Sequence, residues 1–325
     1  MIRRVALRWA PARLALALVL AAAVPLASAG ELAEFLDRAT LAARKLNYVG
    51  TIVYQHAGLG ETSRLVHLNE NGLEIEKLVN LDGPAREVIR SMGEVRSFYP
   101  DARIVRIEPR TFRNAFPSLS PQQQKSLAEF YELKKVETSR VAGMESQAYV
   151  FEPKDGLRYG HKFWAEIGTG LLLKARIINE KDEVVEQFTF TDIILGARVD
   201  RDMVKPSWPA SPPGWAVLRA GPDDVESQDT GWGVAKAPPG FVKIVEGWRN
   251  LRNKRGPVAH LVYSDGLVAV SVFVEPASPS PRATGLVQQG GINAFVRQVD
   301  DGVVTVLGEV PPATVRQIAQ SVARR

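Results

Sequence analysis

The 325-residue sequence contains no cysteine and only four histidines. Without cysteine there are no structural disulfides, thiolate nucleophiles or cysteine-liganded zinc and iron–sulfur sites. The histidines stand singly, and no two of them have the two-to-five-residue spacing of a preformed metal face; they are His56, His67, His161 and His260. We therefore expect neither a metal nor a cofactor.

Local motifs of catalysis and nucleotide binding are also missing. The sequence has no GxxxxGK[ST] loop, no GxGxxG segment after a strand, no HExxH pair and no GxSxG elbow. The adjacent carboxylates Asp223-Asp224 and Asp300-Asp301 are interpreted as turns, because acid–base catalysis needs carboxylates that converge from different elements. A serine nucleophile stays open, since its partners are spatial neighbours. We predict that the protein is not an enzyme.

Excess positive charge is confined to the N-terminus. The net charge is +5, but four arginines fall within the first thirteen residues, and the remainder holds 37 basic and 36 acidic residues. This balance removes the electrostatic reason to expect nucleic acid as a partner. The apolar run Leu14–Leu26 and the small residues Ala27–Ala29 follow, in the order of a secretory signal peptide. Because the run is shorter than the roughly 20 residues of a membrane span, we predict that residues 1–29 are cleaved and that the mature protein is exported.

The hydrophobic period changes once near the start of the mature chain. Between Leu32 and Leu46 the apolar residues follow the spacing of one helix face. Thereafter the period is two, which predicts antiparallel strands over 48–55, 63–69, 74–81, 86–92, 94–99, 103–108, 147–152, 162–167, 171–178 and 184–194. The capping pattern Ser120–Gln123 predicts a second helix that carries Leu127, Phe130 and Tyr131.

A proline-rich segment divides the chain. Four prolines in the eleven residues 205–215 are too many for a central strand or helix. We predict a first domain over 30–205, a linker over 206–222 and a second domain over 223–325. The second domain has two hairpins with Asp-Gly turns, 258–264 with 267–275 and 292–299 with 303–307, and a final helix from about Pro312. Both domains are therefore predicted to be α+β.

The first domain is rich in aromatic residues but has only two predicted helices to cover its sheet. A curved sheet of about ten strands encloses an apolar cavity, although a plain core role is the alternative for any single aromatic. Candidate wall residues are Tyr54, Phe98, Phe163 and Phe188. A loop-like segment sets two aromatics beside two arginines and is interpreted as the entrance for an anionic amphiphile, or else as a core plug; its residues are Arg110, Phe112, Arg113 and Phe116.

Five stretches in order carry a family resemblance. They are Leu46–Thr51, Leu81–Arg90, Tyr263–Leu267, Ser271–Phe273 and Gly308–Pro311. Together they resemble the RseB/MucB periplasmic regulators of the extracytoplasmic stress sigma factor, over nearly the whole mature chain. The resemblance implies an N-terminal unclosed antiparallel β-barrel like that of lipoprotein carriers, followed by a smaller C-terminal domain.

The same resemblance implies a binding function in the periplasm. Members of the family hold the periplasmic part of a membrane-spanning anti-sigma factor, shield it from proteolysis and release it when lipopolysaccharide or a related lipid binds. An alternative is a periplasmic lipid or lipoprotein carrier, which needs only the barrel, and a third is an envelope hydrolase. We expect the C-terminal domain to present the protein-partner surface and the linker around Trp208 and Trp215 to change orientation. A homo-oligomer stays open.

Overall fold

The computed structural model describes residues 29–56, 58–91, 93–109, 127–219, 228–249, 256–276, 284–299 and 302–325. The predicted signal peptide lies almost wholly outside this range, as does the entrance segment from Arg110 to Phe116. Of the second predicted helix, residues 127–130 are described and are helical, whereas Tyr131 already begins a strand. Among the described helices, none combines the length and apolarity needed to cross a membrane.

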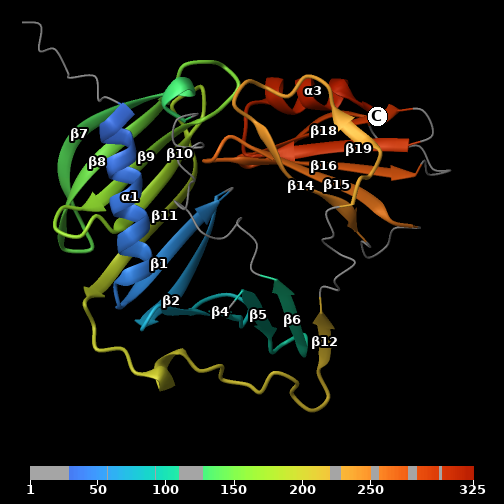
Figure 1. Ribbon diagram of the computed structural model, residues 1–325. Helices are drawn as coiled ribbons and strands as arrows, with labels where there is room; N and C mark the ends of the chain where they lie inside the picture. Colours follow the sequence, from blue (N-terminus) through green and yellow to red (C-terminus); the bar gives the residue numbers. More distant parts are fainter. Residues whose placement is uncertain are drawn as a thin grey trace, which may run out of the picture.

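The first domain is built on one sheet of twelve strands in the order β12-β6-β5-β4-β3-β2-β1-β11-β10-β9-β8-β7 (Figure 1). All neighbours are antiparallel except β12 and β6, and the edge strands β7 and β12 lie at opposite ends of the order. The sheet is therefore unclosed. Its strands are β1 (Tyr48–His56), β2 (Leu59–Glu70), β3 (Leu73–Asn80), β4 (Glu87–Ser91), β5 (Glu94–Tyr99), β6 (Ile104–Pro109), β7 (Tyr131–Val141), β8 (Met144–Pro153), β9 (Gly160–Glu166), β10 (Leu172–Ile178), β11 (Val184–Leu195) and β12 (Ala216–Arg219).

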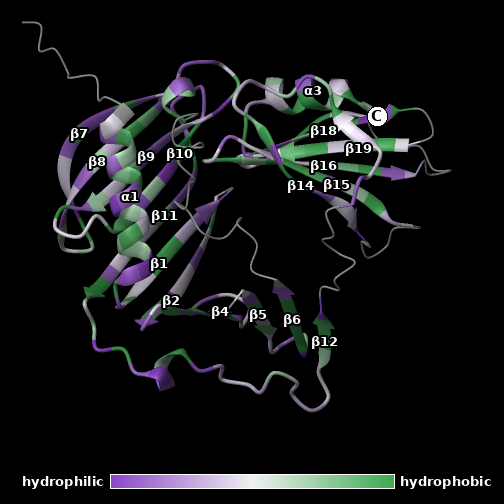
Figure 2. Ribbon diagram, in the orientation of Figure 1, coloured by the Kyte–Doolittle hydropathy of each residue, from purple (hydrophilic) through white to green (hydrophobic). Residues whose placement is uncertain are grey.

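Helix α1 (Ala29–Lys45) packs on one face of this sheet, in front of β8 to β11 (Figure 1). Its apolar positions recur at helical spacing, so Leu32, Phe35, Leu36 and Ala39 are all buried. Figure 2 shows the resulting alternation of hydrophobic and hydrophilic bands along α1. The predicted helix is confirmed, and we call the side of the sheet that it covers the α1 face.

The opposite side of β1 to β6 is covered by the chain between β11 and β12, which we call the linker face. Here Val204, at the end of the 3₁₀ turn η2 (Arg201–Val204), is buried in a cluster with Val49 and Val66. Further on, Trp208 lies 5.9 Å from Phe98 and 5.8 Å from Trp215 between ring centroids. The tract predicted as a linker therefore packs on the first sheet through both tryptophans and contributes its edge strand β12.

The second domain is a six-stranded antiparallel sheet, ordered β14-β15-β16-β19-β18-β17, with α3 (Pro312–Ser321) packed on one face (Figure 1). Its strands are β14 (Val242–Arg249), β15 (Val258–Ser264), β16 (Ala269–Pro276), β17 (Gly285–Gln289), β18 (Ile292–Val299) and β19 (Gly302–Gly308), and β13 (Trp232–Val234) pairs separately with β20 (Val322–Arg324). The two predicted hairpins and the final helix are confirmed.

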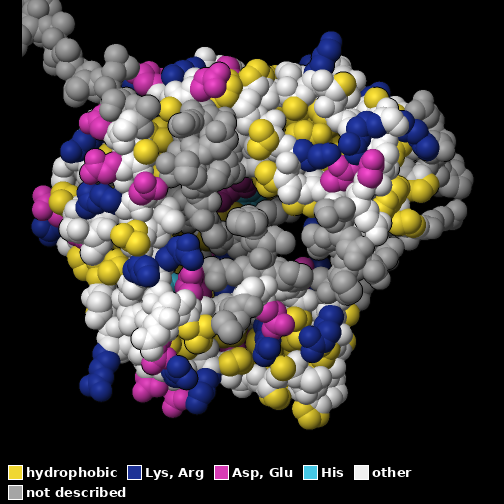
Figure 3. Space-filling view, viewed as in Figure 1, with side chains coloured by type: hydrophobic (Ala, Val, Ile, Leu, Met, Phe, Trp, Pro, Cys, Tyr) yellow, Lys and Arg dark blue, Asp and Glu magenta, His cyan; other side chains and the backbone are white. Residues whose placement is uncertain are grey.

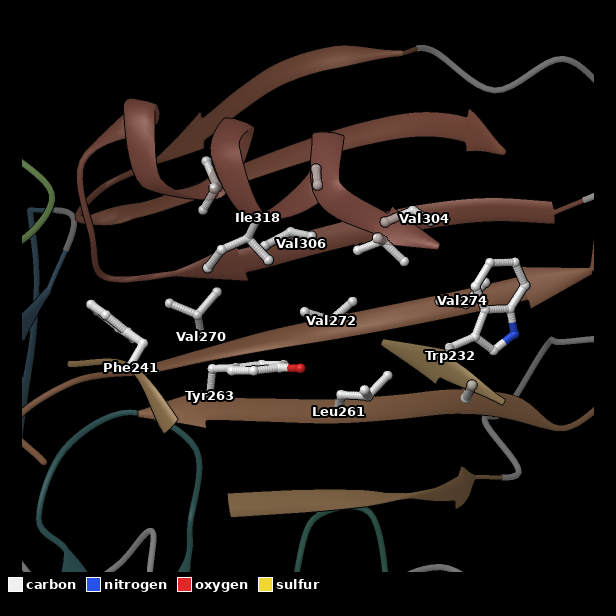
Figure 4. Packing of buried hydrophobic residues seen from close by; sticks show 14 of the residues in the cluster. Trp232, Phe241, Leu261, Tyr263, Val270, Val272, Val274, Val304, Val306 and Ile318 are labelled. Atoms are coloured by element: carbon white, nitrogen blue, oxygen red, sulfur yellow. The ribbon is translucent and has the colours of Figure 1, made fainter. Parts of the chain in front are cut away.

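Helix α3 and the sheet enclose a hydrophobic core made mainly of valine, isoleucine and aromatic residues (Figure 4). Ile318 from α3 meets Val270 and Val272 from β16 and Val306 from β19, all with no measurable exposure. β-branched residues suit both roles, because they fit the pleated sheet and fill the space below the helix. The second domain thus has a hydrophobic core of its own.

Candidate binding site: the aromatic strip and the domain interface

Aromatic side chains form a row across the α1 face that is interrupted by Ala175. The antiparallel register places Tyr54 opposite Phe188, Phe188 opposite Ala175, Ala175 opposite Phe163 and Phe163 opposite Tyr149. Directly opposed residues project from the same face of a sheet. The structure therefore brings together three of the four predicted wall residues, in what we call the aromatic strip.

The aromatic strip is covered at one end and open at the other. Phe35 of α1 lies 4.3 Å from Tyr149 and 6.2 Å from Phe163 between ring centroids, and Phe163 is only 3% exposed. Phe188 is half-buried, and Tyr54 is 37% exposed. Phe163 is thus a core residue, and Phe188 packs against the cluster beneath α1 but stays half-buried, whereas Tyr54 offers exposed surface.

Cavities adjoin both ends of the strip. Beside α1 a cavity of about 200 Å³ is lined by residues that include Phe35, Tyr149 and Arg38. At the far end, a cavity of about 360 Å³ is lined by residues that include His56 and Glu186. Figure 3 shows the face of the molecule seen in Figure 1 hollowed between the second domain and the strands β4 to β6, with acidic and basic side chains interspersed around it.

Phe98 departs from the predicted wall. It lies opposite Val105 on β6 and opposite Glu87 on β4. Followed from strand to strand, the residues paired with Glu87 lead to Thr51 on β1, which projects from the face opposite to that of Ile52. Phe98 therefore projects from the linker face, where it has no measurable exposure beneath Trp208. Period-two reasoning assigns residues to faces within a strand, but only the register across strands fixes which faces coincide.

A buried cluster of polar side chains fastens the second domain to the first. The Arg158 guanidinium, before β9, donates from Nη1 to Asp265 Oδ2 at 3.2 Å, and the Tyr131 hydroxyl donates to the same oxygen at 3.0 Å. Arg158 Nη2 also donates to the Pro239 carbonyl at 2.6 Å. The side chains of Arg158 and Asp265 are 0% and 1% exposed, so this latch, as we call the Arg158–Asp265–Tyr131 cluster, is an ion pair fully removed from water.

Aromatic rings from both domains complete the surroundings of Arg158. Its guanidinium carbon lies 4.6 Å from the Phe130 ring centroid and 5.2 Å from that of Phe241, within the range of cation–π attraction. Gly240 has φ +81°, and a Cβ at this position would lie 2.5 Å from the Phe130 ring. Glycine is therefore required where the two domains approach closely.

The loop between β8 and β9 makes two further contacts with the second domain. Asn293 Nδ2 donates to the Tyr159 hydroxyl at 2.9 Å, and Thr314 Oγ1 donates to the Leu157 carbonyl at 2.6 Å. Asn293 is 1% exposed, and Thr314 has no measurable exposure. Residues 157–159 therefore supply several polar contacts between the domains.

Burial alters the protonation of the latch. It raises the pKa of the Asp265 carboxyl, while Arg158 and the backbone amides of Leu267 and Val268 lower it. Burial and the neighbouring Asp265 raise the pKa of the Tyr131 hydroxyl well above its ordinary value. Tyr131 is therefore a neutral donor. The sequence predicted Asp265 only as the first residue of an Asp-Gly turn, because a turn motif carries no sign of what packs against it.

Two α+β domains, an open sheet with a partly uncovered aromatic strip and a buried interface define a two-domain scaffold suited to binding. Comparison with known families identifies it further. Residues 31–208 match the MucB/RseB N-terminal domain, and residues 226–323 match the MucB/RseB C-terminal domain. The chain belongs to the MucB/RseB family, which confirms the resemblance carried by the five stretches.

Named relatives and solved structures agree with this assignment. The chain is 31% identical to the sigma factor AlgU regulatory protein MucB of Pseudomonas aeruginosa, covering 92% of this chain and 93% of the relative. It is 25% identical to the sigma-E factor regulatory protein RseB of Escherichia coli K12, over 88% and 89%. The structure of the P. aeruginosa MucA/MucB complex matches with a TM-score of 0.72 and 30% identity, over 91% of this chain and 99% of that one.

Proposed function

We propose that this protein is a periplasmic regulator that binds the periplasmic part of a membrane-spanning anti-sigma factor. Bound there, it protects the anti-sigma factor from regulated proteolysis. It releases its partner when lipopolysaccharide or a related acylated lipid binds. The observation that carries the proposal is the match of both domains, in one chain, to MucB in complex with MucA(peri), at a TM-score of 0.72.

The aromatic strip supports lipid binding by the first domain. Tyr54 and Phe188 leave apolar surface uncovered beside α1, and each buried CH₂ of an acyl chain contributes about 0.8 kcal/mol. Our proposed entrance lies in the segment that carries Phe112 and Phe116, with the arginines at 110 and 113 positioned in sequence to meet phosphate groups. Phe163 contributes as the floor of the strip, and Phe98 takes no part.

The presence of a second domain favours a regulator over a lipid or lipoprotein carrier, because a carrier needs only the unclosed barrel of the first domain. Strands β14 and β17 are edges of its sheet, and an edge accepts an extended peptide as an additional strand. If lipid and anti-sigma segment favour different arrangements of the two domains, each lowers the affinity of the other by the same factor. The latch joins the domains at the point where such coupling would pass.

Protease protection tests the proposed function. The periplasmic segment of the organism's anti-sigma factor should co-elute with the purified protein and resist the site-specific protease while bound. Addition of lipopolysaccharide should restore cleavage. A segment that neither co-elutes nor gains protection would contradict the proposal. Export is checked separately by intact mass, because protein from the envelope fraction should lack residues 1–29.

The entrance segment is tested by replacing both Phe112 and Phe116 with Ser. We expect weaker lipid binding and weaker lipid-driven release, with a nearly unchanged melting temperature, because the sequence predicts a loop rather than a strand for this segment. A matched control is Phe163→Ser in the covered floor, which should lower the melting temperature strongly. Unaltered lipid affinity in the folded double variant would make the segment a structural plug.

A further inference from the structure

A second polar cluster joins the domains at the open end of the aromatic strip. His56 is the last residue of β1, and Glu186 lies opposite it on β11. Glu309, directly after β19, reaches them from the second domain. One donor atom from each of the three side chains lies within 4.8 Å of the other two. We call these residues the His–Glu–Glu cluster.

One atom each of His56 and Glu186 lacks a hydrogen-bond partner among the described residues, while Glu186 also hydrogen-bonds Glu309 and Tyr54. His56 Nδ1 and Glu186 Oε2 are 3.8 Å apart, too far for a hydrogen bond. Both atoms are inaccessible to water and have no hydrogen-bond partner among the described residues. Two carboxyl groups, Glu186 and Glu309, meet there, which is unfavourable unless a cation or a proton lies between them.

The Tyr54 hydroxyl adjoins the cluster and donates a hydrogen bond to Glu186. Glu61, the cross-strand neighbour of Tyr54, adds a further acidic group. The nearby cavity of about 360 Å³, which includes His56 and Glu186 in its lining, leaves room for entry and for water ligands.

We propose that His56, Glu186 and Glu309 form an interdomain site for a divalent transition-metal ion such as Zn²⁺. One imidazole nitrogen and two carboxylate oxygens are a ligand set that Zn²⁺ accepts, with water completing a tetrahedron. Donor atoms around tetrahedral zinc are about 3.4 Å apart. The cluster therefore closes on an ion by side-chain movements of about 1 Å, without displacement of a strand.

The site would link metal occupancy to the arrangement of the domains. Two ligands come from the first domain and the third from the second, so a bound ion bridges them. Glycine at 291, between β17 and β18, packs against Val185 beside Glu186; a Cβ there would lie 3.1 Å from the Val185 Cβ. This close contact holds the second domain against β11 where the ion would lie.

Metal titration of the full protein tests the proposal. After removal of metal with a chelator, calorimetric titration with ZnCl₂ should show one ion per chain, and Co²⁺ should give visible absorption bands from the same site. His56→Gln and Glu309→Gln should each weaken Zn²⁺ binding at least tenfold and remove the Co²⁺ bands. The control Glu183→Gln removes a carboxylate from the β10–β11 turn, where it interacts with Asn179, and should leave binding within twofold.

Absence of Zn²⁺ binding by the unaltered protein would overturn the proposal. So would binding that persists, with unchanged affinity and Co²⁺ spectrum, in both ligand variants. Folding of each variant is checked by its melting temperature in chelator. His56 is about one-fifth exposed and Glu309 is half-buried, so these substitutions are expected to leave the fold intact.

Discussion

The latch and the His–Glu–Glu cluster both bridge the two domains, but they differ in how completely their polar atoms are paired. In the latch, Asp265 accepts from Arg158 and Tyr131 through one oxygen and from two backbone amides through the other. In the His–Glu–Glu cluster, one buried atom each of His56 and Glu186 has no partner in the part of the chain that the structure describes. Complete pairing compensates the cost of burying charge, whereas an unpaired atom beside a cavity leaves a place that an ion can fill.

This difference predicts opposite responses to substitution. A paired buried charge becomes strongly destabilising when its partner is removed. A group that is already unpaired loses little when it is neutralised. The first cluster should therefore behave as a structural fastening, and the second as a ligand site that contributes little to stability without its ion.

The largest effect is expected from Arg158→Met. This change leaves the Asp265 carboxylate buried without its counter-ion, and removing one partner of a buried pair typically costs about 3–5 kcal/mol. Chemical unfolding at pH 7 measures the loss. Arg140→Met, on the strand β7, is an exposed control expected to cost little. A loss below about 1 kcal/mol for Arg158→Met would mean that the latch does not fasten the domains.

His161 is expected to make the free energy of unfolding depend on pH by about 3 kcal/mol. Its ring centroid lies 6.1 Å from that of Tyr131. Burial lowers the pKa of His161 from 6.5 to about 4. Between these values the unfolded chain binds a proton that the folded protein excludes, so His161 makes stability fall as pH decreases from about 6.5 to 4.

Replacement of His161 with Phe removes this titration. The quantity of interest is the free energy of unfolding of the variant minus that of the unaltered protein. This difference should be about 3 kcal/mol larger at pH 4 than at pH 7. Groups common to both proteins cancel in this difference, which is measured by urea unfolding at a series of pH values. A difference independent of pH would show that folding does not lower the pKa of His161.

A smaller effect is expected from Tyr131→Phe. The substitution removes only the hydroxyl that donates to Asp265 and leaves the ring packing in place, so we expect a loss of about 1.5 kcal/mol, typical of a hydrogen bond to a charged group. A double-mutant cycle with Arg158→Met measures the coupling between the two donors. If the stability losses of the two single variants add exactly in the double variant, the two donors are not coupled through Asp265.

The smallest effect is expected from Glu309→Gln in the absence of metal. The change removes one of two adjacent carboxyls, so the free energy of unfolding should alter by less than about 1 kcal/mol or increase slightly. Thermal unfolding in chelator checks this outcome. A loss comparable with that of Arg158→Met would show that Glu309 belongs to a paired structural cluster, and would remove the contrast between the two interfaces.

Much of the fold could be predicted from hydrophobic period and turn chemistry. The helix beginning near Leu32, most strands of the first domain and both C-terminal hairpins follow local rules that need no knowledge of neighbours. Strand β7 was not predicted, because the charged residues Lys134, Lys135 and Glu137 mask its apolar alternation. Such charges are typical of an edge strand, and β7 is an edge of the sheet. Strand β12 was not predicted, because the segment before it is rich in proline. An edge strand tolerates nearby proline, since one side of it makes no ladder hydrogen bonds.

The candidate site was less accessible to prediction, because its parts meet only through tertiary structure. Tyr54, Phe163 and Phe188 share a face as predicted, but Phe98 belongs to the other face through a register that no local pattern encodes. Arg158 and Asp265 are 107 residues apart, and each occupies a polar loop that resembles ordinary surface. The histidine at 56 was interpreted as isolated, since its acidic neighbours come from β11 and from the second domain.

The most direct test of the account is the coupling between lipid and protein partner. The labelled periplasmic segment of the anti-sigma factor is titrated with the full protein, and binding is followed by fluorescence anisotropy with and without lipopolysaccharide. We predict saturable binding that lipid weakens by about 5- to 150-fold, the range of a 1–3 kcal/mol coupling. An affinity unchanged by saturating lipid would contradict a lipid-released regulator.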